Sequence, residues 1–151
     1  MKKLSLIIVV IFAISFATNA QKKGGGENVL PKEVKQLAQT YMDILHTSSN
    51  LAELAIRFAK IAIPDKLNED GTLTTHASNY LVRNYKLRES YPKTIQIDRV
   101  YVTSNSSYVG PADYYHIDIN NLDGKSNGSI NIIVPKTGVK RTPKVAHVHF
   151  K

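Results

Sequence analysis

The chain has 151 residues, no cysteine, and a formal net charge of +8, with 20 Lys and Arg residues against 12 Asp and Glu residues. This length suits a single domain with its own hydrophobic core. The lack of cysteine excludes disulfides and a lipid anchor attached to a cysteine. No aromatic and basic motif accompanies the positive charge, so the composition does not favour nucleic acid as a partner.

The first twenty residues have the pattern of a secretory signal. Residues 1–3 read MKK, residues 4–17 form an apolar run, and small residues precede Gln21. The run is shorter than the ~20 residues that a membrane-spanning helix needs, although an uncleaved membrane anchor is the alternative. We expect a signal peptide over residues 1–20 with cleavage after Ala20, a periplasmic or secreted mature protein, and no membrane span in the rest of the chain.

Residues 21–30 are rich in glycine and charge, which predicts a flexible leader before one domain over residues 31–151. A first helix is predicted from Pro31, because apolar residues then recur at a spacing of three and four. A second helix is predicted from a cap at Ser49 or Asn50, and the spacing of Asn50 to Glu53 is that of a capping box.

The end of the second helix allows two interpretations. Ile61 and Ile63 are two residues apart, so the helix either gives way to a short strand there or continues to Ile63. A third helix is predicted from a cap at Thr74 or Thr75. One side of this helix presents Ala77, Leu81 and Tyr85.

From residue 93 the apolar period changes to two, which predicts strands over residues 93–105, 112–120, 129–135 and 144–150. In the first strand the apolar parity changes between Ile97 and Val100, which predicts a bulge near Asp98 and Arg99. Helices followed by an antiparallel meander predict an α+β domain. Its N-terminal helices are expected to pack on one face of a bent, four- to five-stranded sheet.

Strand parity predicts two different faces of this sheet. Ala146, Val148 and Phe150 form the apolar set of the last strand, which turns His147 and His149 away from the core. The strand over residues 112–120 alternates in the same way. The outer face, which a second subunit would cover, is therefore expected to present Tyr114, His116, Asp118, His147 and His149.

The order of elements and three segments carry a resemblance to a known superfamily. The segments are NLAELAIRFAKIAIPD (50–65), GTLTTHASNYLVRNY (71–85) and PKVAHVHFK (143–151). Over residues 31–150 the chain resembles the nuclear transport factor 2-like superfamily, also called cystatin-like in fold, and most closely its SnoaL-like and small secreted branches. Pro143 departs from the pattern, since it stands where the ending usually has a pocket-closing tryptophan.

The resemblance implies a cone-shaped domain with a cavity between its helices and the concave face of the sheet. Members of the superfamily use this cavity for small, mostly apolar ligands, and many of them dimerise through the sheet. We expect no cofactor. In this chain the tyrosines that we expect at such a ligand are Tyr41, Tyr80, Tyr85 and Tyr115.

Two functional hypotheses remain open. The leading one is an exported, non-catalytic binding or assembly domain that forms a homodimer through its sheet and has a pocket for a small apolar ligand. The alternative is a small-molecule isomerase, dehydratase or hydrolase that uses a buried carboxylate or histidine in the cone. Its candidate catalytic residues are Asp98, His46 and Asp43, none of which has a diagnostic spacing.

A metal site is a third hypothesis for the end of the chain. His147 and His149 share a strand face, and His116 could supply a third imidazole, which is a ligand set that zinc accepts. Strand parity favours the simpler interpretation, in which these histidines form a polar outer face without a metal.

Overall fold

A computed structural model describes residues 22–24, 30–107, 110–136 and 142–151. The predicted signal peptide and, within the leader, residues 21 and 25–29 lie outside the described residues. Helices α1 (Lys32–Thr47), α2 (Leu51–Ala59) and α3 (Thr75–Leu87) precede the strands β2 (Ile97–Ser107), β3 (Gly110–Asn120), β4 (Ser126–Pro135) and β5 (Lys144–Phe150). A short strand, β1 (Lys22–Gly24), pairs with β2, which gives an antiparallel sheet in the order β1-β2-β3-β4-β5.

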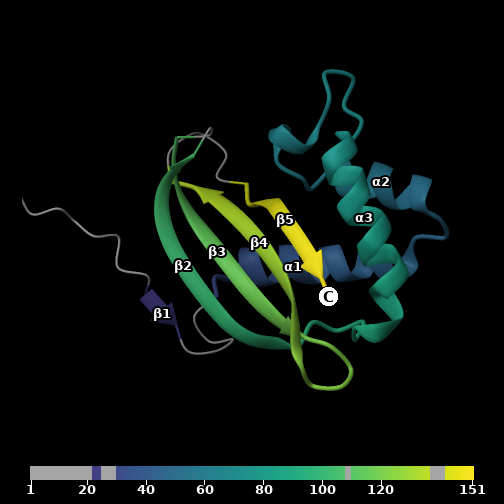
Figure 1. Ribbon diagram of the computed structural model, residues 1–151. Helices are drawn as coiled ribbons and strands as arrows, with labels where there is room; N and C mark the ends of the chain where they lie inside the picture. Colours follow the sequence, from purple (N-terminus) through teal and green to yellow (C-terminus); the bar gives the residue numbers. More distant parts are fainter. Residues whose placement is uncertain (1–21, 25–29, 108–109, 137–141) are drawn as a thin grey trace, which may run out of the picture.

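The predicted α+β architecture is confirmed. Figure 1 shows α1 lying across one face of the curved sheet, with α2 and α3 beyond the β5 edge. Two single-turn 3₁₀ helices, η2 (Pro64–Lys66) and η3 (Arg88–Ser90), lie in the connections before and after α3.

The predicted helix caps of α2 and α3 are present. The Asn50 side chain accepts a hydrogen bond of 2.9 Å from the Glu53 amide, and the Glu53 carboxylate accepts one of 2.9 Å from the Ser49 amide. The Thr74 hydroxyl accepts from the Ala77 amide at 3.3 Å. These contacts satisfy backbone donors that a helix leaves unpaired in its first turn.

The chain after α2 forms a short extended pairing, as one of the two interpretations predicted. The Val145 amide donates to the Ile61 carbonyl at 2.8 Å, and the Ile63 amide donates to the Val145 carbonyl at 2.9 Å. Ala62 and Val145 therefore form a parallel bridge on the free side of β5. The helix does not continue to Ile63, because the backbone groups of residues 61–63 pair with this strand.

The register of the strands separates an inner face from an outer face. A register shift between Ile97 and Arg99 confirms the bulge that was predicted at Asp98. On the inner face, the rows across β2 to β5 are Val102–Tyr115–Ile132–Val145, Val100–Ile117–Ile130–Val148 and Ile97–Ile119–Gly128–Phe150. On the outer face they are Thr103–Tyr114–Ile133–Lys144, Tyr101–His116–Asn131–His147 and Arg99–Asp118–Ser129–His149.

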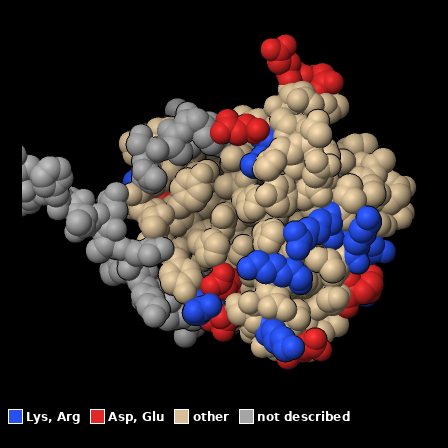
Figure 2. All heavy atoms as spheres, in the orientation of Figure 1, with Lys and Arg blue, Asp and Glu red and all other residues tan. Residues whose placement is uncertain are grey.

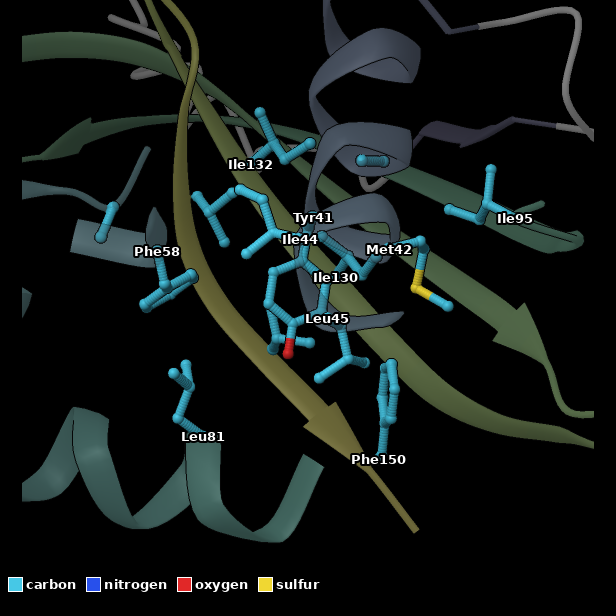
Figure 3. Packing of buried hydrophobic residues seen from close by; sticks show 14 of the residues in the cluster. Tyr41, Met42, Ile44, Leu45, Phe58, Leu81, Ile95, Ile130, Ile132 and Phe150 are labelled. Carbon is cyan, nitrogen blue, oxygen red and sulfur yellow. The ribbon is translucent and has the colours of Figure 1, made fainter. Parts of the chain in front are cut away.

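Closely packed side chains fill the space between α1 and the inner face. Tyr41, Leu45, Ile130 and Phe150 have no exposed surface, and Figure 3 shows these residues pointing toward one another between α1 and the strands. Tyr91 stacks on Phe150 with ring centroids 3.9 Å apart. Such rings exclude water from a large apolar area, which is the main source of stability in a domain of this size.

The predicted position of Ala146 needs a correction. Ala146 is buried, but it does not share a core cluster with Val148 and Phe150. A register shift in β5 pairs Asn131 with His147 and Ile132 with Val145, so Ala146 is an extra residue on its strand. It belongs to a second cluster with Ile63, Ala112 and Ile133, because a bulge reverses the parity of the residues on either side of it.

Asn84 covers the free edge of β5. Its side chain is buried, donates to the Val148 carbonyl at 3.3 Å and accepts from the Phe150 amide at 3.1 Å. The side-chain amide nitrogen of Asn84 also donates to the Tyr41 hydroxyl at 3.0 Å. The Asn84 side chain therefore pairs with backbone groups of β5 that a further strand would otherwise pair with, and it also joins β5 to α1. This part of the β5 edge is not exposed.

Gly128 provides the space that the Tyr91 ring occupies. A Cβ atom on Gly128 would lie 2.9 Å from Ile119 Cγ1 and 2.9 Å from Tyr91 Cε1. Gly128→Ala should therefore lower the free energy of unfolding by about 1–3 kcal/mol in urea denaturation, through overpacking. Gly124→Ala is the comparison for backbone strain without overpacking, because its φ of +74° disfavours alanine while no atom lies within 4 Å of the added Cβ. A Gly128→Ala variant as stable as the wild type would show that the Tyr91 ring can move away from the added methyl group.

Candidate functional site

The outer face of the sheet is polar and aromatic, and much of it remains accessible. The charged residues in its three rows are Arg99, Asp118 and Lys144. Lys144 lies on β5, at the edge of the face, and its ammonium group donates to the Lys60 carbonyl at 2.8 Å. Figure 2 shows a largely uncharged middle of this face, with Lys and Arg side chains gathered toward α3 and the C-terminus. We take this face as the candidate functional site.

A charge-paired cluster occupies one end of this face. Asp118 accepts from His116 Nε2 at 3.0 Å, and Arg99 Nη2 lies 3.5 Å from its other oxygen. Arg99 also donates to Asp98 at 3.0 Å. One guanidinium therefore contacts the carboxylates of two neighbouring strands, Asp98 of β2 and Asp118 of β3. Asp118 is 17% exposed and Arg99 is 54% exposed, so the cation is the more accessible partner.

Two shallow hollows lie along the outer face and share His116. One hollow, of about 340 Å³, is lined by Tyr101, Thr103, Tyr114, His116 and Asn131. The other, of about 170 Å³, is lined by polar residues of β3, β4 and the C-terminus, including Asp118, His149 and Lys151. Asn131 lines the first hollow, and its side-chain oxygen is buried without a hydrogen-bond partner among the described residues.

Two segments border the face on the β5 side. Ile63 packs against Ala112, Ile133 and Ala146, and so covers the end of the face next to the β2–β3 turn. From α3, Tyr80 reaches over β5, with its ring centroid 4.6 Å from that of His147 and 6.1 Å from that of His149. The face that remains open is centred on β2, β3 and β4.

The interface residues that were predicted lie on this one face. The register places Tyr114, His116 and Asp118 in three successive outer rows, and His147 and His149 at the β5 ends of two of them. The predicted interface residues do not include Arg99, Tyr101 or Asn131. Tyr101 could have been found from the parity of Val100 and Val102, but the other two needed the register between strands.

The tyrosines that were predicted around a ligand in the cone do not surround one space. Tyr41 is fully buried, and burial raises the pKa of its hydroxyl, although the hydrogen bond from Asn84 opposes this. Tyr85 donates to the Ser49 carbonyl at 3.2 Å, Tyr115 is partly buried against the main core, and Tyr80 lies over the outer face.

A small void lies between α2, α3 and β5. Its lining includes Phe58, Leu81 and Asn84, and also Tyr80, which is the one predicted ligand tyrosine at this void. The volume of about 20 Å³ is the space of one water molecule. A small apolar ligand could enter here only if these side chains moved apart, because drug-sized ligands occupy pockets of roughly 300–1,000 Å³.

The candidate catalytic residues lie in different surroundings. Asp98 is paired with Arg99 at the bulge and is 35% exposed. Asp43 is exposed on α1 and accepts from Gln39 at 2.8 Å. His46 has a buried Nε2 without a hydrogen-bond partner in the described part of the chain, and burial lowers its pKa, while nearby Glu89 opposes this.

The three histidines that could have held a metal ion do not converge. The rings of His147 and His149 are stacked with centroids 6.3 Å apart, and His116 is hydrogen-bonded to Asp118. Across the described ranges, no group of three or more His, Cys, Asp or Glu side chains is arranged to hold a metal ion.

Among the residues whose structure is described, no helix combines the length and the apolar character that a membrane span requires. A scan against models of protein families found no match to this chain, and searches of curated proteins and of solved structures found none either.

Proposed function

We propose that this protein is an exported, non-catalytic binding and assembly domain with a nuclear transport factor 2-like fold, and that two copies associate through the outer face of the sheet. The observation that carries the proposal is the uncharged, aromatic middle of this face on a chain of net charge +8. The export part of the proposal rests on the signal pattern of residues 1–20.

The charge distribution favours a second copy as the occupant. Two molecules of this basic chain repel each other in most orientations, and this repulsion is smallest where neutral surfaces meet. Arg99 and Asp118 are neighbours of opposite charge on the face. A two-fold axis requires a self-complementary surface, and it would allow Arg99 of each copy to approach Asp118 of the other.

The size of the face also suits a dimer. The three open strands, spaced ~4.8 Å apart and up to ~36 Å long, present roughly 500 Å². Two such faces bury roughly 1,000 Å² in total, which is the size of a weak, reversible interface. The hollow of about 340 Å³ gives a second copy a place to insert a side chain.

The packing of the cone favours this proposal over the enzymatic alternative. An enzyme of the proposed fold needs an acid or base beside a space that holds a substrate. The side chains between α1 and the sheet fill that space, and Asp98, Asp43 and His46 do not line the void between α2, α3 and β5. The proposal therefore includes no ligand inside the cone.

Static light scattering across a dilution series tests the dimer. We expect the mass of two chains at concentrations of about 100 μM, with dissociation on dilution, as for a micromolar interface. A protein with the mass of one chain at every concentration up to about 1 mM would rule out the proposal.

Arg99→Glu should weaken the dimer at least about tenfold, because it would place a third carboxylate beside Asp98 and Asp118. Sedimentation equilibrium measures the dissociation constant. Lys32→Glu, at an exposed position of α1, is the matched control because it changes the net charge by the same amount away from the sheet. Equal dissociation constants for both variants would place the interface elsewhere.

A further inference from the structure

A ladder of aromatic rings crosses the β5 border of the outer face. It consists of His76 and Tyr80 of α3 and His147 and His149 of β5, and is called the histidine ladder below. The ring centroids are 4.8 Å apart between His76 and Tyr80, 4.6 Å between Tyr80 and His147, and 6.3 Å between the two β5 histidines. Three titratable imidazoles are therefore held within contact of one tyrosine ring.

The surroundings of His147 favour its neutral form. Partial burial lowers its pKa first, and the positive charge of Lys66 lowers it further, with smaller contributions from His149, His76 and His116. The groups that face it come from η2, α3, β3 and its own strand, and all of them are cations or imidazoles. A proton on His147 thus has no carboxylate among these groups to balance it.

His149 has similar surroundings on the side of the C-terminus. Burial lowers its pKa, and Arg83 of α3 and Lys151 lower it further. Asp118 lines the same hollow of about 170 Å³. However, this carboxylate already accepts from His116 at 3.0 Å and lies 3.5 Å from Arg99.

The histidines of the face have different neighbours. His116 lies 3.0 Å from the carboxylate of Asp118. A proton on His147 or His149 adds charge to a region that already holds Lys66, Arg83 and Lys151. In a two-fold dimer this charge would be present on both copies at the border of the interface, where like charges oppose association.

We infer that self-association through the outer face is controlled by pH, with His147 and His149 as the groups that must be neutral for two copies to associate. The inference rests on the proposed dimer. It predicts association near pH 7.5 and dissociation toward pH 5.5, as these histidines take up protons on both copies. Tyr80 is part of the switch, because it holds both imidazoles at the border of the interface.

The sign follows from proton linkage. A dimer that lowers the pKa of a histidine below its value in the monomer releases protons on association, so acid favours the monomer. With an ordinary pKa of about 6.5, each of four histidines in a dimer contributes up to about tenfold at pH 5.5. The surroundings of His147 and His149 already lower their pKa values in the monomer, so the four histidines together contribute less than this maximum. We expect the dimer to weaken at least about tenfold between pH 7.5 and pH 5.5.

Sedimentation equilibrium of the purified protein at pH 7.5 and pH 5.5 tests the inference, with circular dichroism at both values to confirm that the chain stays folded. The double variant His147→Gln/His149→Gln should dimerise at both pH values with little change in dissociation constant, because its amides do not titrate. His46→Gln is the matched control: it removes a histidine of α1 with a lowered pKa and should keep the pH dependence.

The outcomes separate the inference from the proposed function. A wild-type dimer with the same dissociation constant at both pH values would overturn the inference and leave the dimer intact. A double variant that keeps the full pH dependence would also overturn it. A monomer at every pH and concentration would overturn both the dimer and its control by these histidines.

Discussion

Replacing Asn84 by alanine should lower the free energy of unfolding by about 3 kcal/mol, which is large for a polar side chain. The variant leaves the Phe150 amide and the Tyr41 hydroxyl buried without the partner that each has now. An unpaired buried polar group costs roughly 1–3 kcal/mol. The gain in helix propensity from Asn to Ala is smaller, at most ~0.7 kcal/mol.

Asn79→Ala is the matched control for this prediction. Asn79 lies on the same helix, α3, but is exposed. The same change in helix propensity therefore applies there without the loss of buried hydrogen bonds, and Asn79→Ala should be neutral or slightly stabilising in urea denaturation. Hydrogen exchange gives a second measurement, because the Phe150 amide should exchange faster in Asn84→Ala. Two variants of equal stability would show that water replaces the Asn84 amide at the β5 edge.

Much of the fold could be predicted because its signals are local. The capping box at Asn50 involves residues within four positions of each other. The bulge at Asp98 is visible as a change of apolar parity within one strand, and the alternation in β3 places Tyr114 and His116 correctly. Such signals depend on the period of a helix or strand, which the sequence displays directly.

The role of Asn84 could not be predicted, because its partners lie far away in the chain. It contacts Tyr41 of α1, 43 positions earlier, and Val148 of β5, 64 positions later. A single asparagine on a helix is usually exposed, so nothing near it in the sequence indicates a strand edge. The β5 bulge was missed for a similar reason, since the packing of Ala146 depends on Ile63 beyond α2.

The candidate site was predicted in part. Parity within a strand identifies the residues of one face, which is why His147 and His149 could be assigned to the outer side. It does not say which residue of the next strand lies opposite. The contact between Arg99 and Asp118 depends on the register of β2 and β3 after the bulge, and the position of Tyr80 depends on how α3 packs against β5.

Phe150→Ala should lower the free energy of unfolding by about 3–5 kcal/mol, whereas His149→Ala, one residue earlier, should change it by no more than about 0.5 kcal/mol at pH 7.5. Phe150 has no exposed surface. Its ring stacks on Tyr91 with centroids 3.9 Å apart and lies nearly perpendicular to the Tyr41 ring with centroids 6.2 Å apart. His149 lies on the outer face, where alanine leaves no internal cavity.

Urea denaturation of both variants measures this contrast on one strand. Tyr91→Leu, alone and combined with Phe150→Ala, completes a double-mutant cycle, and we expect a coupling energy of about 1 kcal/mol from the stacked rings. A loss for Phe150→Ala as small as that expected for His149→Ala would mean that β5 does not pack against the core. The last residues of the chain would then be a flexible tail, and neither the inner core nor the outer histidine ladder would have the support that this strand gives them.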